Sequence, residues 1–488
     1  MSQITSLGDD ARIALDNLGD AASHLLSPTV RFGVTGLSRA GKTVFISALV
    51  HNLLNSGRLP LFSVASQGRL RDAALEPQPD DTIPRFKVEQ HLDALLRDRT
   101  WPSSTSSISQ LRVRLKYDSA GFFARNFGAG ELTLDIVDYP GEWLLDLPLL
   151  GKTFETWSRE ALALSRLEGR ADLASTWHAA LAEHPFDGPA SEVVAEQLSA
   201  HFTEYLRACR SDDRALSTLP PGRFLMPGDM EGSPALTFCP LDCPHNTGQV
   251  GADTLHGLMA RRFESYKSLV IKPFFRDHFA RIDRQIVLVD VLSAINAGSK
   301  AVADLETALG EILDCFNHGR RSWLTSLFST RTDRILFAAT KADHLHHTNH
   351  DRLESILNHL VRRARERAQF SGAHTDVVAL AALRATTEGE IKDGKDTVPI
   401  VVGTPLAGET LGDETFDGLK RTGIFPGDLP HNPKDITDPN TAIDPLRFVR
   451  FRPPEFSHAQ DKADTVELKL PHIRLDRALE FLFGDYLQ

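Results

Sequence analysis

The sequence predicts an α/β fold in which a mostly parallel sheet carries helices on both faces. Two short apolar runs, at residues 286–289 and 335–339, have the continuous hydrophobicity of strands that are covered on both sides. A stretch with apolar residues at helical spacing follows each run. A glycine-rich turn at residues 36–43 joins an earlier apolar strand to another helix. Such alternation of strand and helix is typical of α/β proteins.

The composition is that of a soluble globular protein with more than one compact part. At 488 residues the chain is longer than one hydrophobic core usually organises, so we expect a main domain with an insertion or extension. We find no apolar stretch of about 18 residues that would cross a bilayer, no signal peptide, and too few cysteines for a disulfide scaffold. These features predict a cytoplasmic protein. A net charge of −11 argues against nucleic acid as a partner.

The first part of the chain alternates predicted helices and strands. Apolar residues at helical spacing in residues 4–26 predict an amphipathic N-terminal helix. Residues 29–35 predict a buried strand, and residues 44–57 the helix that follows it. Strict alternation at 111–117 and an apolar run at 132–137 predict two further strands.

The remainder combines a helical region with more strands. Residues 144–280 predict an inserted helical subdomain, interrupted by a Pro- and Gly-rich stretch at 219–247. Residues 377–383 predict a buried strand, 385–445 a loop-heavy extension, 448–451 a strand and 475–487 a terminal helix. The predicted division is an N-terminal helix (1–28), the first half of the main domain (29–143), the helical insertion (144–280), the second half of the main domain (281–390) and a C-terminal extension packing on it (391–488).

Residues 36–43, Gly-Leu-Ser-Arg-Ala-Gly-Lys-Thr, match the phosphate-binding loop pattern. Glycines in such a loop let backbone N–H groups close around phosphate oxygens without side-chain collision. Lys42 would neutralise the β- and γ-phosphates, and Thr43 would give its hydroxyl to Mg²⁺. The alternative is an ordinary glycine turn. The expected nucleotide contacts from this region are Gly36, Ser38, Arg39, Ala40, Gly41, Lys42, Thr43 and Val44.

Two later motifs extend this interpretation. Asp138-Tyr139-Pro140-Gly141 ends an apolar strand, where the Asp138 carboxylate can reach the Mg²⁺ shell and the Gly141 N–H can meet the γ-phosphate. Its alternative is a Pro-Gly turn with a capping Asp. Thr340-Lys341-Ala342-Asp343 follows another apolar run, where Asp343 can accept two hydrogen bonds from guanine while the Lys341 stem lies along the base. Adenine cannot donate that pair, and the alternative here is a solvated turn.

The order of these three motifs resembles that of Ras-like GTPases, with Thr340 in the first position of the guanine motif. The resemblance implies a Ras-like G domain and a base-contacting turn at Ala382 and Leu383. It implies a switch I threonine as a further Mg²⁺ ligand, for which Thr105 is the candidate. A polar linker is the alternative for that segment, and Ser104 or Ser106 could take the same role. The predicted metal ligands are therefore Thr43, Thr105 and Asp138.

The resemblance also raises the question of what orients the attacking water. Glu142 stands where Ras-like enzymes have Gln, so either Glu142 orients water or activity is low. Arg39 could stabilise transition-state charge in cis, or be an exposed loop arginine. The candidate catalytic residues are Lys42, Thr43, Gly141 and Glu142.

Longer strings resemble the YcjX-like family of bacterial predicted GTPases over nearly the whole chain. They run from the phosphate-binding loop through Asp-Tyr-Pro-Gly-Glu-Trp-Leu at 138–144 to Pro-His-Ile-Arg-Leu-Asp-Arg-Ala-Leu-Glu-Phe-Leu at 471–482. The resemblance implies a Ras-like core with a large helical insertion and a C-terminal extension. It also implies an association with the bacterial envelope stress response.

Three other clusters have an ordinary explanation beside a functional one. Cys239, Cys243 and His245 could ligate a metal, but a closed zinc site needs a fourth ligand. A His-rich tract can bind metal, yet a polar loop or helix start explains this one as well; its members are His344, His346, His347 and His350. A basic helix face could contact a partner or a phospholipid headgroup, or be merely solvated; its members are Arg362, Arg363, Arg365 and Arg367.

The sequence thus predicts a GTP-binding protein that hydrolyses GTP to GDP and phosphate with Mg²⁺, by in-line attack of water on the γ-phosphate. The first alternative is a nucleotide-dependent binding module with negligible hydrolysis, in which the GTP and GDP states expose different surfaces of the insertion 144–280 to a protein effector. The second is an ATPase or nucleotide kinase, which requires the Asp343 motif to be accidental. Peripheral membrane contact is compatible with the sequence but not indicated by it.

Overall fold

The computed structural model describes residues 28–456 and 469–488, apart from internal gaps. The gaps are residues 38, 56, 104, 106, 121–129, 212–213, 244–250, 315–331, 371, 394–395 and 439–445. The N-terminal helix predicted at 4–26 lies outside the described residues.

A seven-stranded sheet forms the centre of the molecule, in the order β2-β3-β4-β1-β5-β6-β7. Strands β4, β1, β5, β6 and β7 are parallel, whereas β2 and β3 are antiparallel to their neighbours. The strands span Thr29–Gly36 (β1), Leu70–Glu76 (β2), Ser109–Tyr117 (β3), Gly130–Asp138 (β4), Arg284–Val289 (β5), Arg334–Ala339 (β6) and His374–Ala379 (β7). The predicted mostly parallel α/β sheet is confirmed. The strand expected at 377–383 ends at Ala379, and the edge strand β2 was not predicted.

Alternate residues of the central strands enter two hydrophobic cores, because successive side chains of a strand point to opposite faces. Ile286 and Leu288 of β5 pack on one face with α2 and α15, and Val287 and Val289 pack on the other. The edge of the Phe483 ring meets Phe32 at a centroid distance of 5.1 Å. The first face is covered by α2 (Lys42–Leu54), α4 (Val88–Asp93) and α15 (Leu475–Phe483), and the second by α12 (Ser299–Asp314), α13 (His350–Leu360) and α14 (Arg362–Phe370).

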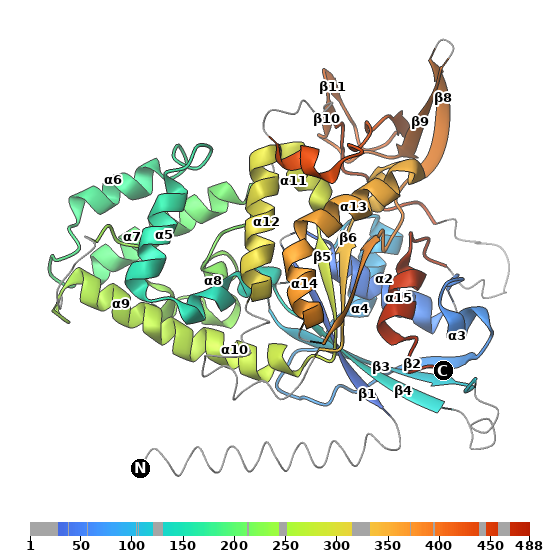
Figure 1. Cartoon of the computed structure of the whole chain (residues 1–488), viewed down its shortest axis with the longest axis horizontal. Coiled ribbons are helices and arrows are strands. Elements are labelled where there is room, and N and C mark those ends of the chain that lie inside the picture. Colours follow the sequence, from blue (N-terminus) through green and yellow to red (C-terminus); the bar gives the residue numbers. More distant parts are fainter. Residues whose placement is uncertain are drawn as a thin grey trace.

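Residues 144–280 are mostly helical, as predicted, and form a lobe beside the sheet (Figure 1). The helices are α5 (Phe154–Ser165), α6 (Ser175–Glu183), α7 (Glu192–Cys209), α8 (Gly222–Leu225), α9 (Leu255–Tyr266) and α10 (Lys272–Asp277). Trp157 anchors their core, stacked on Phe263 at 5.1 Å and edge-on to Phe202 at 6.0 Å. This core is continuous with the second face of the sheet. The lobe is therefore packed onto the sheet and is not a tethered module.

The C-terminal extension contains more regular structure than the sequence predicted. A three-stranded antiparallel sheet joins β8 (Thr387–Asp393), β9 (Asp396–Gly403) and β12 (Thr422–Ile424), and β10 (Thr410–Leu411) pairs with β11 (Glu414–Thr415). The prediction of a loop-heavy stretch missed these strands. The run Val-Pro-Ile-Val-Val at 398–402 lies in β9, with Ile400 and Val401 buried, but it contains a proline and is flanked by Gly, Asp and Thr, which are typical of loops. The predicted domain boundary at 390 falls inside β8.

The strand predicted at 448–451 was also wrong. Only Phe451 pairs, in an isolated bridge with Pro405. Val449 and Phe451 are nevertheless both buried in one small cluster with Val401 and Ile424. Two backbone hydrogen bonds beside this bridge link the segment to residues 404–406, so the apolar alternation marks an extended segment that is paired too briefly to form a strand.

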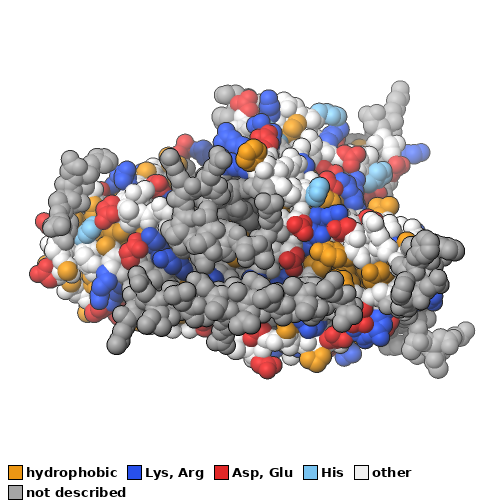
Figure 2. Space-filling model, turned by 60° about the horizontal axis from the view of Figure 1, so that its bottom comes forward, with side chains coloured by type: hydrophobic (Ala, Val, Ile, Leu, Met, Phe, Trp, Pro, Cys, Tyr) orange, Lys and Arg blue, Asp and Glu red, His pale blue; other side chains and the backbone are white. Residues whose placement is uncertain are grey.

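The remaining elements are short. They are α3 (Ser63–Ser66), α11 (Val291–Ala297), π-helical turns at Ala94–Asp98 and Lys267–Ile271, and 3-10 helices at Gly141–Gly151, Gly228–Met230, Pro234–Leu236, Phe279–Arg281, Ala342–His344, His347–Asn349 and Pro433–Thr437. Within the described part of the chain, no helix has the length and apolar character needed to cross a membrane. Figure 2 shows acidic and basic side chains interspersed over the described part of one face.

Candidate nucleotide-binding site

The phosphate-binding loop lies between the end of β1 at Gly36 and the start of α2 at Lys42. Gly41 precedes the helix with φ at +83°, a left-handed conformation that glycine adopts without strain. No side chain caps the first turn of α2, so its backbone N–H groups face the loop. The Lys42 ammonium donates to the Gly36 carbonyl at 3.0 Å. Ser38 lies outside the described residues.

The three predicted metal ligands meet beside this loop, although they come from three distant segments. The hydroxyl oxygens of Thr43 and Thr105 are 3.3 Å apart, and the Thr105 hydroxyl donates to the Asp138 carboxylate at 2.8 Å. Asp138 is 2% exposed, and its Oδ1 atom has no hydrogen-bond partner among the described residues. A buried carboxylate oxygen without a donor is costly unless a cation meets it.

Burial dominates the ionisation of Asp138. It raises the pKa of this carboxyl group from 3.8 to about 6, although the Lys42 ammonium, the Thr105 hydroxyl and the Tyr139 backbone N–H favour the charged form. Two hydroxyls and a carboxylate are hard oxygen donors, the kind that Mg²⁺ prefers. The donor set and the unpartnered Oδ1 atom therefore fit a magnesium ion.

The segment after Asp138 is held tightly against the loop. The Tyr139 hydroxyl and the Thr35 hydroxyl are 2.6 Å apart, and the Gln285 amide donates to Thr35 at 2.6 Å. A Cβ atom on Gly141 would lie 1.6 Å from the carbonyl oxygen of Gly36. Only glycine permits this approach, so Gly141 keeps its backbone against the phosphate-binding loop.

The next residue, Glu142, is paired with a residue of the helical insertion. Its carboxylate lies 3.0 Å from the guanidinium of Arg210, which follows α7, and Glu142 is only 4% exposed. Both side chains line the same cavity as the phosphate-binding loop. Sequence reasoning missed Arg210 because it lies in no motif and more than 60 residues beyond the Asp-x-x-Gly segment.

Two further arginines, Arg39 and Arg450, line the cavity close to Arg210. Arg39 has a left-handed φ of +63° in the loop, and Arg450 reaches the cavity from the C-terminal extension. Burial, followed by repulsion from Arg210 and Arg450, lowers the pKa of Arg39. Two of these arginines already have carboxylate partners, since Arg210 pairs with Glu142 at 3.0 Å and Arg450 with Glu409 at 2.7 Å.

The Thr340–Asp343 motif lines the same cavity. Asp343 is 4% exposed; its carboxylate accepts from the Ala385 N–H at 2.8 Å, and its carbonyl accepts from the Thr386 hydroxyl. Lys341, at a left-handed φ of +61°, pairs with the carboxylate of Asp290. Asp343 is thus fixed by the segment that leads into β8.

Asp290 is a second residue that sequence reasoning missed. Burial alone would oppose its ionisation, but the Lys341 ammonium and hydrogen bonds from Ser293 keep the pKa of Asp290 below its ordinary value. It directly follows β5, as Asp138 ends β4. Its position at the carboxyl end of a parallel strand is the signal that could have identified it.

The turn at Ala382 and Leu383 also reaches the cavity. Its neighbour Ala381 exchanges two backbone hydrogen bonds with Ile473, at 3.1 and 2.8 Å. The segment that leads into α15 therefore holds this turn in place. This contact links the last helix of the chain to the predicted base-binding end of the site.

One cavity of about 660 Å³ connects these parts, a volume typical of small-molecule sites. The predicted site residues that line it are Arg39, Ala40, Gly41, Lys42, Thr43, Val44, Thr105, Glu142, Thr340, Lys341, Asp343, Ala382 and Leu383. Gly36, Asp138 and Gly141 contact this lining through the interactions given above.

Of the cysteine and histidine clusters considered above, His344 lines this cavity. Cys239 is buried, which raises the pKa of its thiol well above the ordinary value, and His245 lies outside the described residues. His350 bonds to the Ala342 carbonyl at 2.9 Å. Among the described His, Cys, Asp and Glu residues, His346, His347 and Glu388 make the one group of three whose ligand atoms all lie within 4.8 Å of one another.

Comparison with known proteins places the chain in a family. A family model described as YcjX-like family, DUF463, matches residues 30–487. A protein of Escherichia coli named Ras-like GTPase YcjX is 38% identical over 475 residues, which cover 94% of this chain and 96% of that protein. A protein of Shewanella oneidensis with the same name is 33% identical over 499 residues, covering 98% and 99%. The motifs, the sheet and these full-length matches agree: the chain belongs to the YcjX-like family.

Proposed function

We propose that this protein binds GTP with Mg²⁺ and hydrolyses it to GDP and phosphate. The observation that carries the proposal is the meeting of Thr43, Thr105 and Asp138 beside the phosphate-binding loop, with the Asp138 Oδ1 atom buried and unpartnered. The names of the two relatives support the same activity. The association with envelope stress stays an expectation from the family resemblance.

Each residue has a proposed role that follows from its position. Thr43, Thr105 and Asp138 would hold Mg²⁺, which neutralises charge on the β- and γ-phosphates. Lys42, now bonded to the Gly36 carbonyl, would exchange that neutral acceptor for a phosphate oxygen. The first N–H groups of α2 would surround the phosphates because the helix dipole favours anions there.

The location of Asp343 supports guanine as the base. Asp343 lines the cavity together with Ala382 and Leu383. The hydrogen bond that its carboxylate accepts from Ala385 fixes one oxygen and thereby the plane of the group. A fixed pair of acceptors matches the two adjacent donors of guanine and rejects adenine, whose edge lacks them.

Glu142 is the proposed water-orienting residue, and Arg210 its positioning residue. The ion pair at 3.0 Å holds the Glu142 carboxylate at the cavity wall, close to Gly141. A carboxylate there can accept a hydrogen bond from the attacking water. In this assignment the helical insertion contributes to catalysis through Arg210.

The same ion pair also favours a second candidate function. A Glu142 side chain that stays bound to Arg210 cannot orient water, and the protein would then be a nucleotide-dependent binding module with negligible turnover. Turnover decides between the two candidates. Phosphate release from GTP above that of Lys42→Ala supports the enzyme, whereas equal release supports the binding module.

Fluorescent-nucleotide binding tests the guanine site. GDP, GTP and ATP are titrated with Mg²⁺ against the wild type, Asp343→Asn and a matched control, Asp413→Asn, whose side chain is exposed. We expect the wild type and the control to prefer guanine nucleotides and Asp343→Asn to lose that preference, because an amide donor replaces one acceptor. Equal binding of ATP, or an unaffected Asp343→Asn variant, would support the ATPase interpretation.

A further inference from the structure

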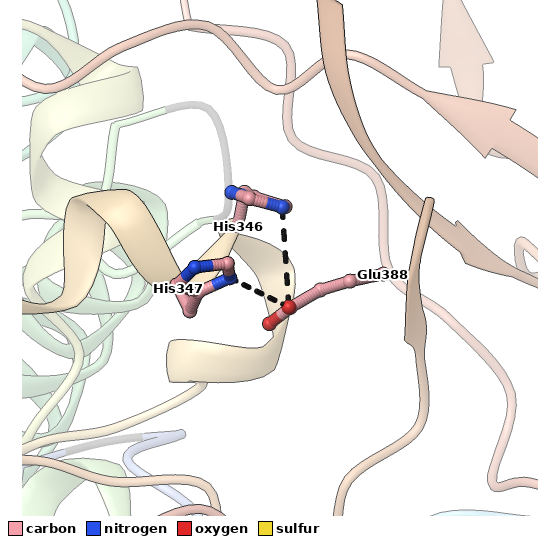
Figure 3. A group of neighbouring side chains, drawn as sticks. All are labelled: His346, His347 and Glu388. Atoms are coloured by element: carbon pink, nitrogen blue, oxygen red, sulfur yellow. Dashed lines mark hydrogen bonds and ion pairs between the residues drawn. The ribbon is translucent and has the colours of Figure 1, made fainter. Parts of the chain in front are cut away.

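A compact group of potential metal ligands lies outside the cavity lining, where residues 340–347 meet the C-terminal extension. Residues 340–347, which contain Asp343, are called the base-recognition loop below. His346 and His347 follow the Asp343 motif, and Glu388 belongs to β8 (Figure 3). The His347 Nδ1 atom lies 2.7 Å and the His346 Nε2 atom 3.9 Å from the same Glu388 oxygen, Oε2. All three ligand atoms lie within 4.8 Å of each other.

We propose that His346, His347 and Glu388 form a Zn²⁺ site that joins the base-recognition loop to β8. Two imidazole nitrogens and one carboxylate are a donor set that zinc uses with a water in the fourth position. Ligands of a tetrahedral zinc ion are about 3.3 Å apart, between the two distances to Glu388. Each of the two distances to Glu388 would therefore change by about 0.6 Å on binding.

Neighbouring groups orient the ligands as in known metal sites. The Nδ1 atom of His346 lies 3.0 Å from the Thr348 hydroxyl. A proton on Nδ1, donated to Thr348, leaves the Nε2 lone pair directed at Glu388. Arg384 binds the other carboxylate oxygen, Oε1, at 3.2 Å and so leaves Oε2 for the ion.

The exposure of the group allows an ion to enter and keep a water. His346 is buried, Glu388 is partly buried, and the His347 side chain is 64% exposed. Burial works against the charged form of Glu388, yet hydrogen bonding to His347 and the nearby Arg384 lower the pKa of Glu388 overall. The carboxylate is therefore ionised at neutral pH, as a metal ligand must be.

The position of the site suggests what the ion does. Ala385 and Thr386, which bond to Asp343, directly precede β8 and Glu388. An ion that ties His346 and His347 to Glu388 therefore fixes both segments around Asp343. Zinc should slow the release of guanine nucleotide; this second part rests on the proposed function.

Titration of Zn²⁺ into the full-length protein tests the site. We expect one tight site per chain in the wild type and an affinity at least about 100-fold lower in His347→Ala and Glu388→Gln, since even outer-shell partners contribute about 10- to 100-fold. Thr348→Val should weaken binding about tenfold. A matched control, His374→Ala, removes an exposed histidine of β7 and should bind like the wild type.

Two measurements keep the outcome decisive. Unfolding curves without metal should coincide for the wild type and His347→Ala, which excludes misfolding, and Co²⁺ should give the visible spectrum of a four-coordinate site only in the wild type. Equal Zn²⁺ affinity in the wild type and both ligand variants would overturn the site. No tight binding in the wild type would overturn it as well.

The release of labelled GDP, with Mg²⁺ constant and Zn²⁺ present or removed by a selective chelator, tests the second part. We expect Zn²⁺ to slow release at least threefold in the wild type and to have no effect in Glu388→Gln. Equal rates would overturn the coupling even if zinc binds. A protein that binds zinc but no GDP would refute the proposed function and leave the site standing.

Discussion

The buried carboxylate of Asp138 carries a cost that a pH experiment can measure. Its pKa is raised from 3.8 to about 6, mainly by burial. For an acid, a raised pKa means that folded-state stability is lost as pH rises from the unfolded value through the folded value. From the two pKa values, ionisation of Asp138 lowers the free energy of unfolding by about 1.6 kcal/mol at pH 5 and by about 3 kcal/mol at pH 7.5, since one pKa unit corresponds to about 1.4 kcal/mol.

The perturbation is Asp138→Asn, which keeps the shape and removes the charge. An amide whose N–H₂ group lacks an acceptor adds its own cost to folding, but that cost does not change with pH. The free energy of unfolding of the variant, relative to the wild type, should therefore rise by about 1.4 kcal/mol from pH 5 to pH 7.5. The assay is urea unfolding with a chelator and without nucleotide. The Mg²⁺ dependence of GDP affinity should be lost in the variant.

A matched control comes from the same strand. Asp135 is also buried in β4, but its carboxylate accepts two hydrogen bonds from Arg112, at 2.6 and 2.8 Å. Asp135→Asn should destabilise the protein at both pH values because it breaks an ion pair. A constant difference between Asp138→Asn and the wild type would refute the burial argument. A growing difference with intact Mg²⁺ dependence would refute the metal assignment.

Two further predictions concern the segment after Asp138. Arg210→Ala should lower the turnover number for GTP about 100-fold but change the dissociation constant of GTP less than about threefold, because Arg210 positions Glu142 rather than the nucleotide. Arg210→Lys should restore part of the rate. A loss of GTP affinity as large as the loss of rate would contradict this role. Gly141→Ala should weaken Mg²⁺-dependent GTP binding at least about tenfold, since its Cβ would lie 1.6 Å from a backbone oxygen. In the control Gly151→Ala, the new Cβ would meet nothing within 4 Å, so the free energy of unfolding should change by less than about 0.5 kcal/mol. Similar losses of GTP affinity in Gly141→Ala and Gly151→Ala would contradict the argument.

The sheet could be predicted from sequence because its central strands are covered on both faces. Such strands need uninterrupted apolar runs, as at 286–289 and 335–339, which few other structures require. The hairpin of β8 and β9 was missed because β8 is polar and the apolar run of β9, at 398–402, contains a proline, which is unusual inside a strand. Edge strand β2 was missed because none of its residues is fully buried.

The site divides in the same way between local and long-range features. Glycine conformation and strand-end carboxylates are local, so residues 36–43 and Asp138 could be found by their spacing. Arg210 could not, because its contact with Glu142 depends on how the helical lobe packs. Glu388 likewise lies near His346 only because β8 folds back beside the loop that contains Asp343. Contacts between distant segments have no periodicity in the sequence.

The packing of the helical lobe also affects how a structural change at the nucleotide would be transmitted through the protein. The 3-10 helix that begins at Gly141 contains Asp146, whose buried carboxylate accepts from the Gly222 N–H at 2.7 Å and the Tyr266 hydroxyl at 2.6 Å. Burial raises the pKa of Asp146 to about 7 despite these donors, and hydrogen bonds to charged groups are worth about 1.5–3 kcal/mol each. Breaking them is costly, so the lobe must move with this helix or hold it still. On the proposed function, a γ-phosphate that displaces Gly141 would therefore change the position of the lobe rather than that of one loop.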